Sequence, residues 1–197
     1  MKLQILIFSI ALGAYAQQPY PHGNENILSK ATYKVKIEND VKVPMGDGVM
    51  LSADIYRPDA PGKFPSLIER TPYSNNAPEE ITDSKWYASR GYVIVNVDVR
   101  GRYDSDGRFY PYRNEANDGY DTDEWVAKQP WSNGKLGTLG GSYLGYTTLT
   151  QAIRANPHLM SMATEVTSSN IYTGWVYVDG AFHMGFALPW GAAEIDG

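Results

Sequence analysis

Residues 136–148 read LGTLGGSYLGYTT, and the interpretation of Ser142 within this stretch decides which fold we expect for the chain. A short apolar run leads to Ser142, and a helical pattern follows it. Gly140 and Gly141 stand directly before the serine, where missing side chains permit a sharp, strained turn. Two interpretations are open: a Gly/Ser turn that caps a helix, or a nucleophile elbow that lifts the serine Oγ above a sheet. The usual elbow is G-x-S-x-G, and here the last glycine, Gly145, comes one residue late.

The rest of the chain alternates strand and helix patterns. Two alternating runs, at 33–45 and 49–58, flank a Gly-Asp-Gly turn and predict an antiparallel hairpin. Further strands are predicted at 64–70, 92–99, 135–140 and 160–167, with helices at 80–90, 115–129 and 143–155 and a turn, PWSNG, at 130–134. Residues 168–197 are rich in aromatics and glycine and show no clear period. The order predicts an α/β fold with a mostly parallel sheet and an antiparallel N-terminal hairpin at its edge.

The amino-acid composition argues against several classes of function. The chain has 197 residues, 43% hydrophobic and 20% charged, which is typical of a globular protein. A net charge of −5 gives no support to nucleic-acid binding. The absence of cysteine excludes disulfides, Cys-ligated zinc and thiol chemistry. The three histidines, His22, His158 and His183, lie too far apart in sequence for a metal-ligand spacing, so no metal site is expected.

The N-terminus has the pattern of a secretory signal peptide. Met1-Lys2 is a basic start, residues 3–12 are apolar, and Ala14-Tyr15-Ala16 is a cleavage pattern before Gln17. A buried N-terminal helix is the alternative. We expect cleavage after Ala16, a secreted or periplasmic product with a polar segment at 17–32, and no later membrane span, because no later stretch reaches the roughly 18 apolar residues required.

Two further loops bear on chemistry. Residues 98–107, DVRGRYDSDG, suggest a calcium loop, but placing Gly107 at position 6 puts Arg102 at position 1 and Arg113 at position 12, where acids are needed. The calcium interpretation therefore fails, and a surface loop remains. Residues 70–74, RTPYS, follow the third strand, where a hydrolase of this architecture holds its oxyanion loop. Tyr73 could donate its phenolic hydrogen there, or simply pack after a proline turn.

Taken together, VPMGDGVMLSADIYRPD, ERTPYS, GYVIVNVDVRGRYDSDG and GTLGGSYLGYT resemble the X-Pro dipeptidyl-peptidase group of serine hydrolases. That group also holds esterases of the cocaine esterase type and α-amino-acid ester hydrolases. The resemblance runs from about Val41 to the end of the chain. Its G-x-S-Y-x-G core is more specific than the general serine-hydrolase pattern.

The resemblance implies an α/β-hydrolase core, a helical cap after the sixth strand, a C-terminal jelly-roll domain and no cofactor. Ser142 matches the acylated nucleophile. Tyr143 matches the residue whose backbone N–H forms half of the oxyanion hole, and Tyr73 the tyrosine whose hydroxyl forms the other half. Residues 33–167 would be the N-terminal part of the catalytic domain, and residues 168–197 the start of the cap.

One departure from the family pattern concerns the base. In α/β hydrolases the acid and histidine follow the serine, and the family carries both past the cap, so we expect them beyond Gly197. His158 is expected to have no catalytic role, and His183 to pack or line the cap rather than act as base. Asp179 and Glu194 are candidates for binding a substrate amine, with ordinary solvated acids as the alternative.

The predicted function is a secreted serine hydrolase acting on an ester, amide or peptide substrate through a Ser142 acyl-enzyme. Within these 197 residues it would lack the groups that activate the serine. The alternative is a non-catalytic binding or scaffold protein that kept the sheet and elbow. No nucleic-acid partner and no membrane contact after signal cleavage are expected. A sheet that ends at its sixth strand would expose an edge prone to aggregation.

Overall fold

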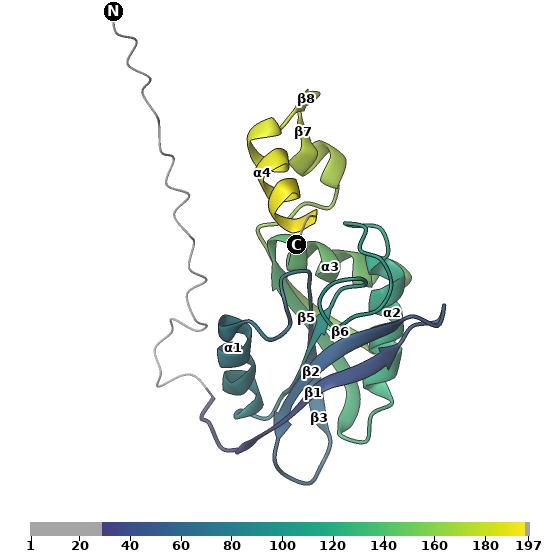
Figure 1. Ribbon diagram of the computed structural model, residues 1–197. Helices are drawn as coiled ribbons and strands as arrows, with labels where there is room; N and C mark the ends of the chain where they lie inside the picture. The colour runs from purple at the N-terminus through teal and green to yellow at the C-terminus, as the bar shows by residue number, and fades with distance from the viewer. Residues whose placement is uncertain (1–28, 196–197) are drawn as a thin grey trace, which may run out of the picture.

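The structure, a computed structural model, describes residues 29–195 (Figure 1). The predicted signal peptide and its cleavage site, together with His22, lie outside the described residues. A six-stranded sheet with the order β1-β2-β4-β3-β5-β6 forms the centre of the molecule. Its strands are β1 (Val35–Pro44), β2 (Met50–Pro58), β3 (Phe64–Thr71), β4 (Val93–Asp98), β5 (Ser132–Gly141) and β6 (Leu159–Glu165).

The strand directions confirm the predicted mixed sheet. β1 pairs antiparallel with β2, and β2 pairs antiparallel with β4. From β4 to β6 every pairing is parallel. The N-terminal hairpin therefore forms one edge of the sheet and β6 the other. All six residues of β4 are buried, as its continuous apolar run predicts for a strand covered on both faces.

Helices cover the two faces unequally (Figure 1). α1 (Pro78–Ala88) packs on one face, where Ala88 joins a core with Tyr56 and Ile94. α2 (Glu115–Ala127) and α3 (Ser142–Gln151) lie on the other. The larger core consists mostly of β-branched and leucine side chains, lies beneath α2 and includes its Val126. The predicted series of strand–helix units after the hairpin is confirmed.

Element boundaries differ from the prediction by a few residues in several places, and three of these differences have a clear local cause. The predicted turn at 130–134 is wrong in its second half, because Ser132 already pairs with Phe64 of β3 and Gly134, at φ +77°, lies inside an irregular start of β5. α1 begins two residues early because Pro78 occupies its first turn, where a missing N–H costs nothing. The α3 helix ends at Gln151 and continues as a 3₁₀ turn that Ala155 stops in a left-handed conformation, φ +47°.

The tail forms small elements that stand over the carboxyl ends of the strands (Figure 1). They are a π-helical turn η2 (Tyr172–Val176), a hairpin of β7 (Tyr177–Val178) and β8 (Ala181–Phe182), and α4 (Met184–Ile195). Two-residue strands and a single π turn are too short to show a period, which explains why the sequence gives none here. Within residues 29–195, no helix has the length and apolar character to cross a bilayer.

Candidate active site

Ser142 lies at the junction of β5 and α3, which is the strand–turn–helix setting predicted for it. Its φ is +55°, a left-handed conformation that a non-glycine residue adopts only under strain, and its side chain is exposed. The N-cap position belongs to Gly141, and no side chain caps the helix. The serine is therefore not held there as a helix cap. An exposed hydroxyl on a strained turn at a helix N-terminus is the geometry of a nucleophile elbow.

The two glycines around the elbow are required by close packing. A β-carbon at Gly140 would lie 2.6 Å from the Cβ of Leu144, in the first turn of α3. A β-carbon at Gly145 would lie 2.8 Å from the backbone oxygen of Glu165 at the end of β6. The late glycine of the motif is thus the point at which α3 crosses β6. The packing of α3 on β6 therefore explains the position of Gly145, and this position is compatible with a nucleophile elbow.

Tyr73 lies in the loop after β3, and several contacts order that loop. The Tyr73 N–H donates to Thr71 Oγ1 at 3.0 Å, and the Asn75 N–H donates to Asp98 Oδ1 at 2.8 Å. Arg102 Nε donates to the Pro72 carbonyl at 3.0 Å. Burial raises the pKa of Asp98 to about 7, despite the Asn75 hydrogen bond that favours its charged form.

The structure brings Tyr73 and Tyr143 together. Their ring centroids are 6.4 Å apart and nearly perpendicular, and both belong to one cluster with Val99 and Leu144. The Trp190 indole, from α4, donates its Nε1–H to the Tyr73 hydroxyl at 3.1 Å. A phenol that accepts such a bond becomes a better donor of its own hydrogen. The predicted oxyanion tyrosines are therefore neighbours in space.

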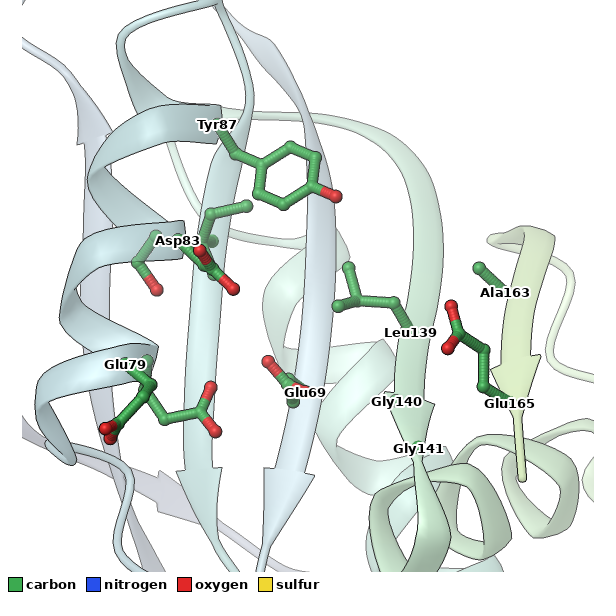
Figure 2. Close-up of a pocket in the computed structure, with 12 residues that line it drawn as sticks. Glu69, Glu79, Asp83, Tyr87, Leu139, Gly140, Gly141, Ala163 and Glu165 are labelled. Atoms are coloured by element: carbon green, nitrogen blue, oxygen red, sulfur yellow. The ribbon is translucent and has the colours of Figure 1, made fainter. Parts of the chain in front are cut away.

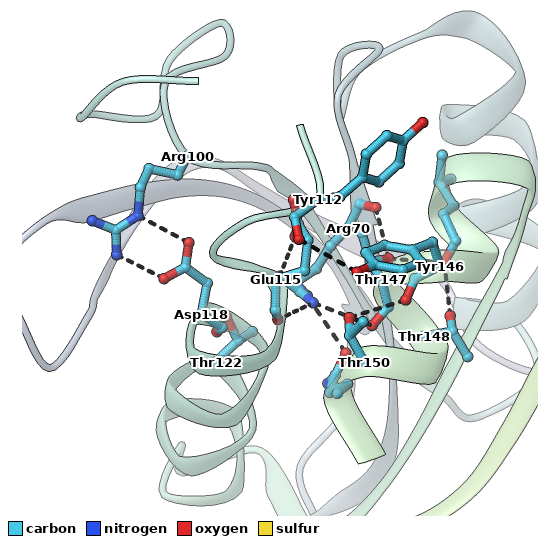
Figure 3. Close-up of polar contacts among 12 residues, drawn as sticks. Arg70, Arg100, Tyr112, Glu115, Asp118, Thr122, Tyr146, Thr147, Thr148 and Thr150 are labelled. Carbon is cyan, nitrogen blue, oxygen red and sulfur yellow. Dashed lines mark hydrogen bonds and ion pairs between the residues drawn. The ribbon is translucent and has the colours of Figure 1, made fainter. Parts of the chain in front are cut away.

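A buried polar network joins the Tyr143 side chain to β3 and α2, and Figure 3 shows its members Arg70, Glu115 and Thr147. The phenol of Tyr143 donates to Glu115 Oε1 at 2.9 Å and accepts the Tyr112 N–H at 3.0 Å. Arg70 pairs with Glu115 Oε2 at 2.9 Å and donates to the Glu115 carbonyl at 2.6 Å and the Thr147 carbonyl at 3.2 Å. Arg70, Glu115 and Tyr143 are 1%, 4% and 1% exposed. β3, α2 and the elbow thus meet at one carboxylate.

Electrostatics keep the Tyr143 phenol protonated. Burial, and then the nearby charge of Glu115, raise the pKa of Tyr143 far above its usual range. Burial also raises the pKa of Glu115, while Arg70 and the Tyr143 hydroxyl favour its charged form. Sequence reasoning missed both Arg70 and Glu115 as parts of the site. The only sequence signal for them is the position of two opposite charges: Arg70 ends an apolar strand pattern, and Glu115 begins a helix pattern.

Aromatic rings cover the network on its outer side. The Tyr112 ring stacks on Tyr143, with centroids 4.7 Å apart, and on Trp190, at 5.8 Å. Trp190 also stacks on Tyr143 at 6.1 Å, and Tyr146 meets Tyr112 edge-on at 5.0 Å. Burial raises the pKa of Tyr112 as well. The tail therefore contributes directly to the packing around the elbow.

On the other face of the sheet, an acidic pocket lies between α1 and the strands β5 and β6 (Figure 2). Its acids are Glu69, Glu79, Glu80, Asp83 and Glu165, and Gly140 and Gly141 form part of its wall. No lysine, arginine or histidine is among the described residues that line it. Burial raises the pKa of Glu69 well above its usual range, and the neighbouring Glu80 and Asp83 raise it further.

The remaining predicted candidates lie away from the elbow. His158 Nδ1 is 3.1 Å from the Gly134 carbonyl near the start of β5, which places it about 25 Å of extended strand from Ser142. His183 is exposed, stacks on Phe186 and lies with its Nδ1 3.3 Å from the Trp175 carbonyl. Among the described residues, no hydrogen bond joins a histidine to Ser142.

The two candidate acids of the tail lie in different elements. Asp179 is exposed in the two-residue turn between β7 and β8, with φ +49°, and Gly180 follows it at +84°. Asp-Gly with two positive φ angles is a preferred hairpin turn, so the local fold accounts for this aspartate. Glu194 falls in the last turn of α4, and its side chain lies outside the described residues.

Comparison with known proteins places the chain in a family. The X-Pro dipeptidyl-peptidase (S15) family profile matches residues 47–196. Cocaine esterase from Rhodococcus sp. (strain MB1 Bresler) is 35% identical over 161 residues, which are 79% of this chain and 28% of that protein. The chain thus spans less than a third of the esterase's length.

Solved structures agree with this placement. A CocE/NonD family hydrolase from Staphylococcus aureus superposes with a TM-score of 0.76 at 25% identity, over 88% of this chain and 38% of that one. An aminopeptidase from a marine sediment archaeon, Thaumarchaeota archaeon, gives 0.70 at 28% identity, over 88% and 32%. Both an esterase and an aminopeptidase are thus similar to one chain. The chain belongs to the X-Pro dipeptidyl-peptidase family of hydrolases and has its α/β-hydrolase fold.

Proposed function

We propose that this chain carries the nucleophile and the oxyanion hole of a serine hydrolase that cleaves an ester, amide or peptide bond through an acyl-enzyme. The observation that carries the proposal is the elbow: Ser142, exposed at φ +55° between β5 and α3. Its family membership supports the reaction class, since relatives include an esterase and an aminopeptidase. The choice between ester and peptide substrates would be made by residues that shape the acyl and leaving-group pockets.

The proposed reaction has two halves. In the first, Ser142 Oγ attacks the substrate carbonyl carbon while a general base takes the hydroxyl proton. The carbonyl oxygen becomes an oxyanion, held by the Tyr143 N–H and the Tyr73 hydroxyl. The tetrahedral intermediate collapses, the leaving group departs with the proton, and an ester to Ser142 remains. In the second, water attacks that ester by the same route, releasing the acid and restoring the serine.

The base is proposed to be a histidine, oriented by an acid, that this chain does not contain. The positions of His158, near the opposite end of β5, and His183, bonded within the tail, support this proposal. The short share of each relative that the chain spans also supports it. We further propose export across a membrane, on the strength of the pattern at residues 1–16. No cofactor takes part in the proposed reaction.

The proposal is tested by steady-state and burst kinetics on the full natural protein. p-Nitrophenyl acetate would report esterase activity, and an X-Pro p-nitroanilide peptidase activity. We expect a burst of p-nitrophenol of about one equivalent per Ser142, followed by slower turnover. Ser142→Ala should abolish the burst. A folded protein that hydrolyses neither substrate, or whose Ser142→Ala variant keeps the burst, would contradict the proposal and favour a non-catalytic binding protein.

A further inference from the structure

The residues that form the proposed oxyanion hole come from two separate segments. Tyr73 follows β3, whereas Tyr143 opens α3, and 70 positions of chain separate them. An oxyanion hole works only when its donors are preorganised, since stabilisation depends on their distance from the developing charge. A misplacement of about 1 Å can lower the rate about a hundredfold. Something in the fold must therefore hold these two segments in register.

One buried carboxylate contacts both segments. Glu115 accepts the Tyr143 phenol at Oε1 and the Arg70 guanidinium at Oε2, each at 2.9 Å. Arg70 lies near the end of β3, three residues before Tyr73 in the following loop, and its backbone oxygen accepts the Thr147 hydroxyl at 3.1 Å. The route from one proposed donor to the other thus runs along the backbone from Tyr73 to Arg70, and then through Glu115 to Tyr143.

Stability alone does not explain such a pair. Moving two opposite charges into a protein interior costs several kcal/mol per ion, and well-packed apolar side chains are often as stable. Here the pair is fully hydrogen-bonded: the carboxylate has two partners, and Arg70 donates to Glu115, to the Thr147 carbonyl and, at 3.5 Å, to Gln151. A satisfied network of this kind fixes one geometry of the groups that it joins.

We propose that the buried Arg70–Glu115 pair is the positioning device of the oxyanion hole, acting through the Tyr143 phenol to fix the backbone N–H of that residue and the strained Ser142 turn relative to Tyr73. Arg70 and Glu115 are positioning residues and touch no substrate. The Tyr143 side chain has the same role, while its N–H is the catalytic group. The inference rests on the proposed function and names residues that the elbow motif does not include.

The test compares Tyr143→Phe with Tyr146→Phe in the full natural protein, with p-nitrophenyl acetate as substrate. Tyr143→Phe keeps the ring that stacks on Tyr112 and removes the hydroxyl that reaches Glu115. Tyr146 lies one turn along α3 and also packs on Tyr112, but its hydroxyl bonds only weakly, to the Tyr112 carbonyl at 3.4 Å. We expect Tyr143→Phe to lower kcat about ten- to a hundredfold with KM within about twofold, and Tyr146→Phe to leave both within about twofold.

A second pair of variants separates positioning from folding. Glu115→Gln keeps an oxygen for the Tyr143 phenol but loses the charge that pairs with Arg70. Its control is Asp118→Asn, one turn along α2, where a similarly buried carboxylate loses its pair with the less buried Arg100 (2.6 Å). Within the described part of the chain, no hydrogen bond joins Asp118 to Arg70, Glu115 or Tyr143. Both should lower Tm. Only Glu115→Gln should lower kcat, by about three- to tenfold, because a neutral amide is the weaker acceptor.

Each outcome decides the inference. Equal kcat for Tyr143→Phe and Tyr146→Phe, or a Tyr143→Phe effect confined to KM, would overturn it while leaving the serine mechanism standing. If Tyr143→Phe does not fold, the comparison of Glu115→Gln with Asp118→Asn decides instead, and equal kcat values there overturn the inference. If the wild-type protein shows no burst that depends on Ser142, the proposed function is wrong, and this inference, which rests on it, is wrong as well.

Discussion

Glu69 and Arg70 are neighbours in β3, yet their side chains enter opposite faces of the sheet and meet opposite environments. Arg70 finds a carboxylate, two carbonyls and an amide oxygen, so its charge is fully paired. Glu69 enters a pocket with four further acids, and no cationic side chain lines that pocket among the described residues. At this end of β3, one face of the sheet therefore holds fully paired charges in a fixed geometry, whereas the other holds acids whose mutual repulsion is relieved by protonation.

The largest expected effect comes from breaking the paired face. Arg70→Met leaves Glu115 buried without its cation, which should cost about 3–5 kcal/mol of the free energy of unfolding. The measurement is urea unfolding at pH 7, monitored by tryptophan fluorescence. A loss below about 1 kcal/mol would mean that Glu115 readily protonates or finds another partner, and the contrast between the faces would weaken.

The pH dependence of stability tests the unpaired acids. Burial raises the pKa values of Glu69 and Glu80, and it raises that of Asp98 to about 7. A carboxyl with a raised pKa binds its proton more tightly in the folded state. Its contribution is therefore complete below the unfolded pKa of about 4 and is lost as the pH rises through the folded value. For Asp98 that window runs from about 4 to about 7.

We therefore expect the free energy of unfolding to fall between about pH 4 and pH 7, by up to about 1.4 kcal/mol per pH unit for each carboxyl that releases its proton. Urea midpoints at intervals of half a pH unit measure it, and Asp98→Asn should flatten the curve. A stability that does not fall with pH over this range would show that these acids are already ionised in the folded protein.

A gain in stability is expected from relieving the acidic face. Glu69→Gln removes one charge from the pocket. It should add about 1 kcal/mol to the free energy of unfolding at pH 8, where Glu69 and Glu80 of the wild-type protein carry the most charge. At pH 5 the gain should vanish. Glu79→Gln is the matched control, because Glu79 is an exposed acid at the rim of the same pocket. Equal effects from the two substitutions would contradict the view that burial and neighbouring acids destabilise the charge of Glu69 in particular.

The smallest expected effect concerns the aromatic cover of the paired face. Trp190→Phe keeps a ring against Tyr112 and Tyr143 but removes the Nε1–H that donates to the Tyr73 hydroxyl. We expect kcat for an ester to fall about two- to fivefold, with stability nearly unchanged, because the Tyr73 phenol becomes a weaker donor. An unchanged kcat would mean that the tail contributes packing alone.

Much of this organisation was predictable from local pattern. The alternation of 33–58, the apolar run of β4 and the glycines beside Ser142 each predict their element from adjacent residues. What the sequence did not predict depends on contacts between distant positions. Glu115 and Arg70 are 45 residues apart, and Trp190 meets Tyr73 across 117. No periodicity or spacing in the sequence predicts these contacts, because they form only when the fold brings β3, α2 and the tail to one end of the sheet.

Labelling with a fluorophosphonate probe tests the proposed role of Ser142 as nucleophile. The full natural protein would be labelled, digested and mapped by mass spectrometry, with Ser142→Ala as the control. We expect one phosphonate adduct, on the peptide that holds Ser142, and none on the folded Ser142→Ala variant. A folded wild-type protein without an adduct, or an adduct that persists in Ser142→Ala, would contradict it.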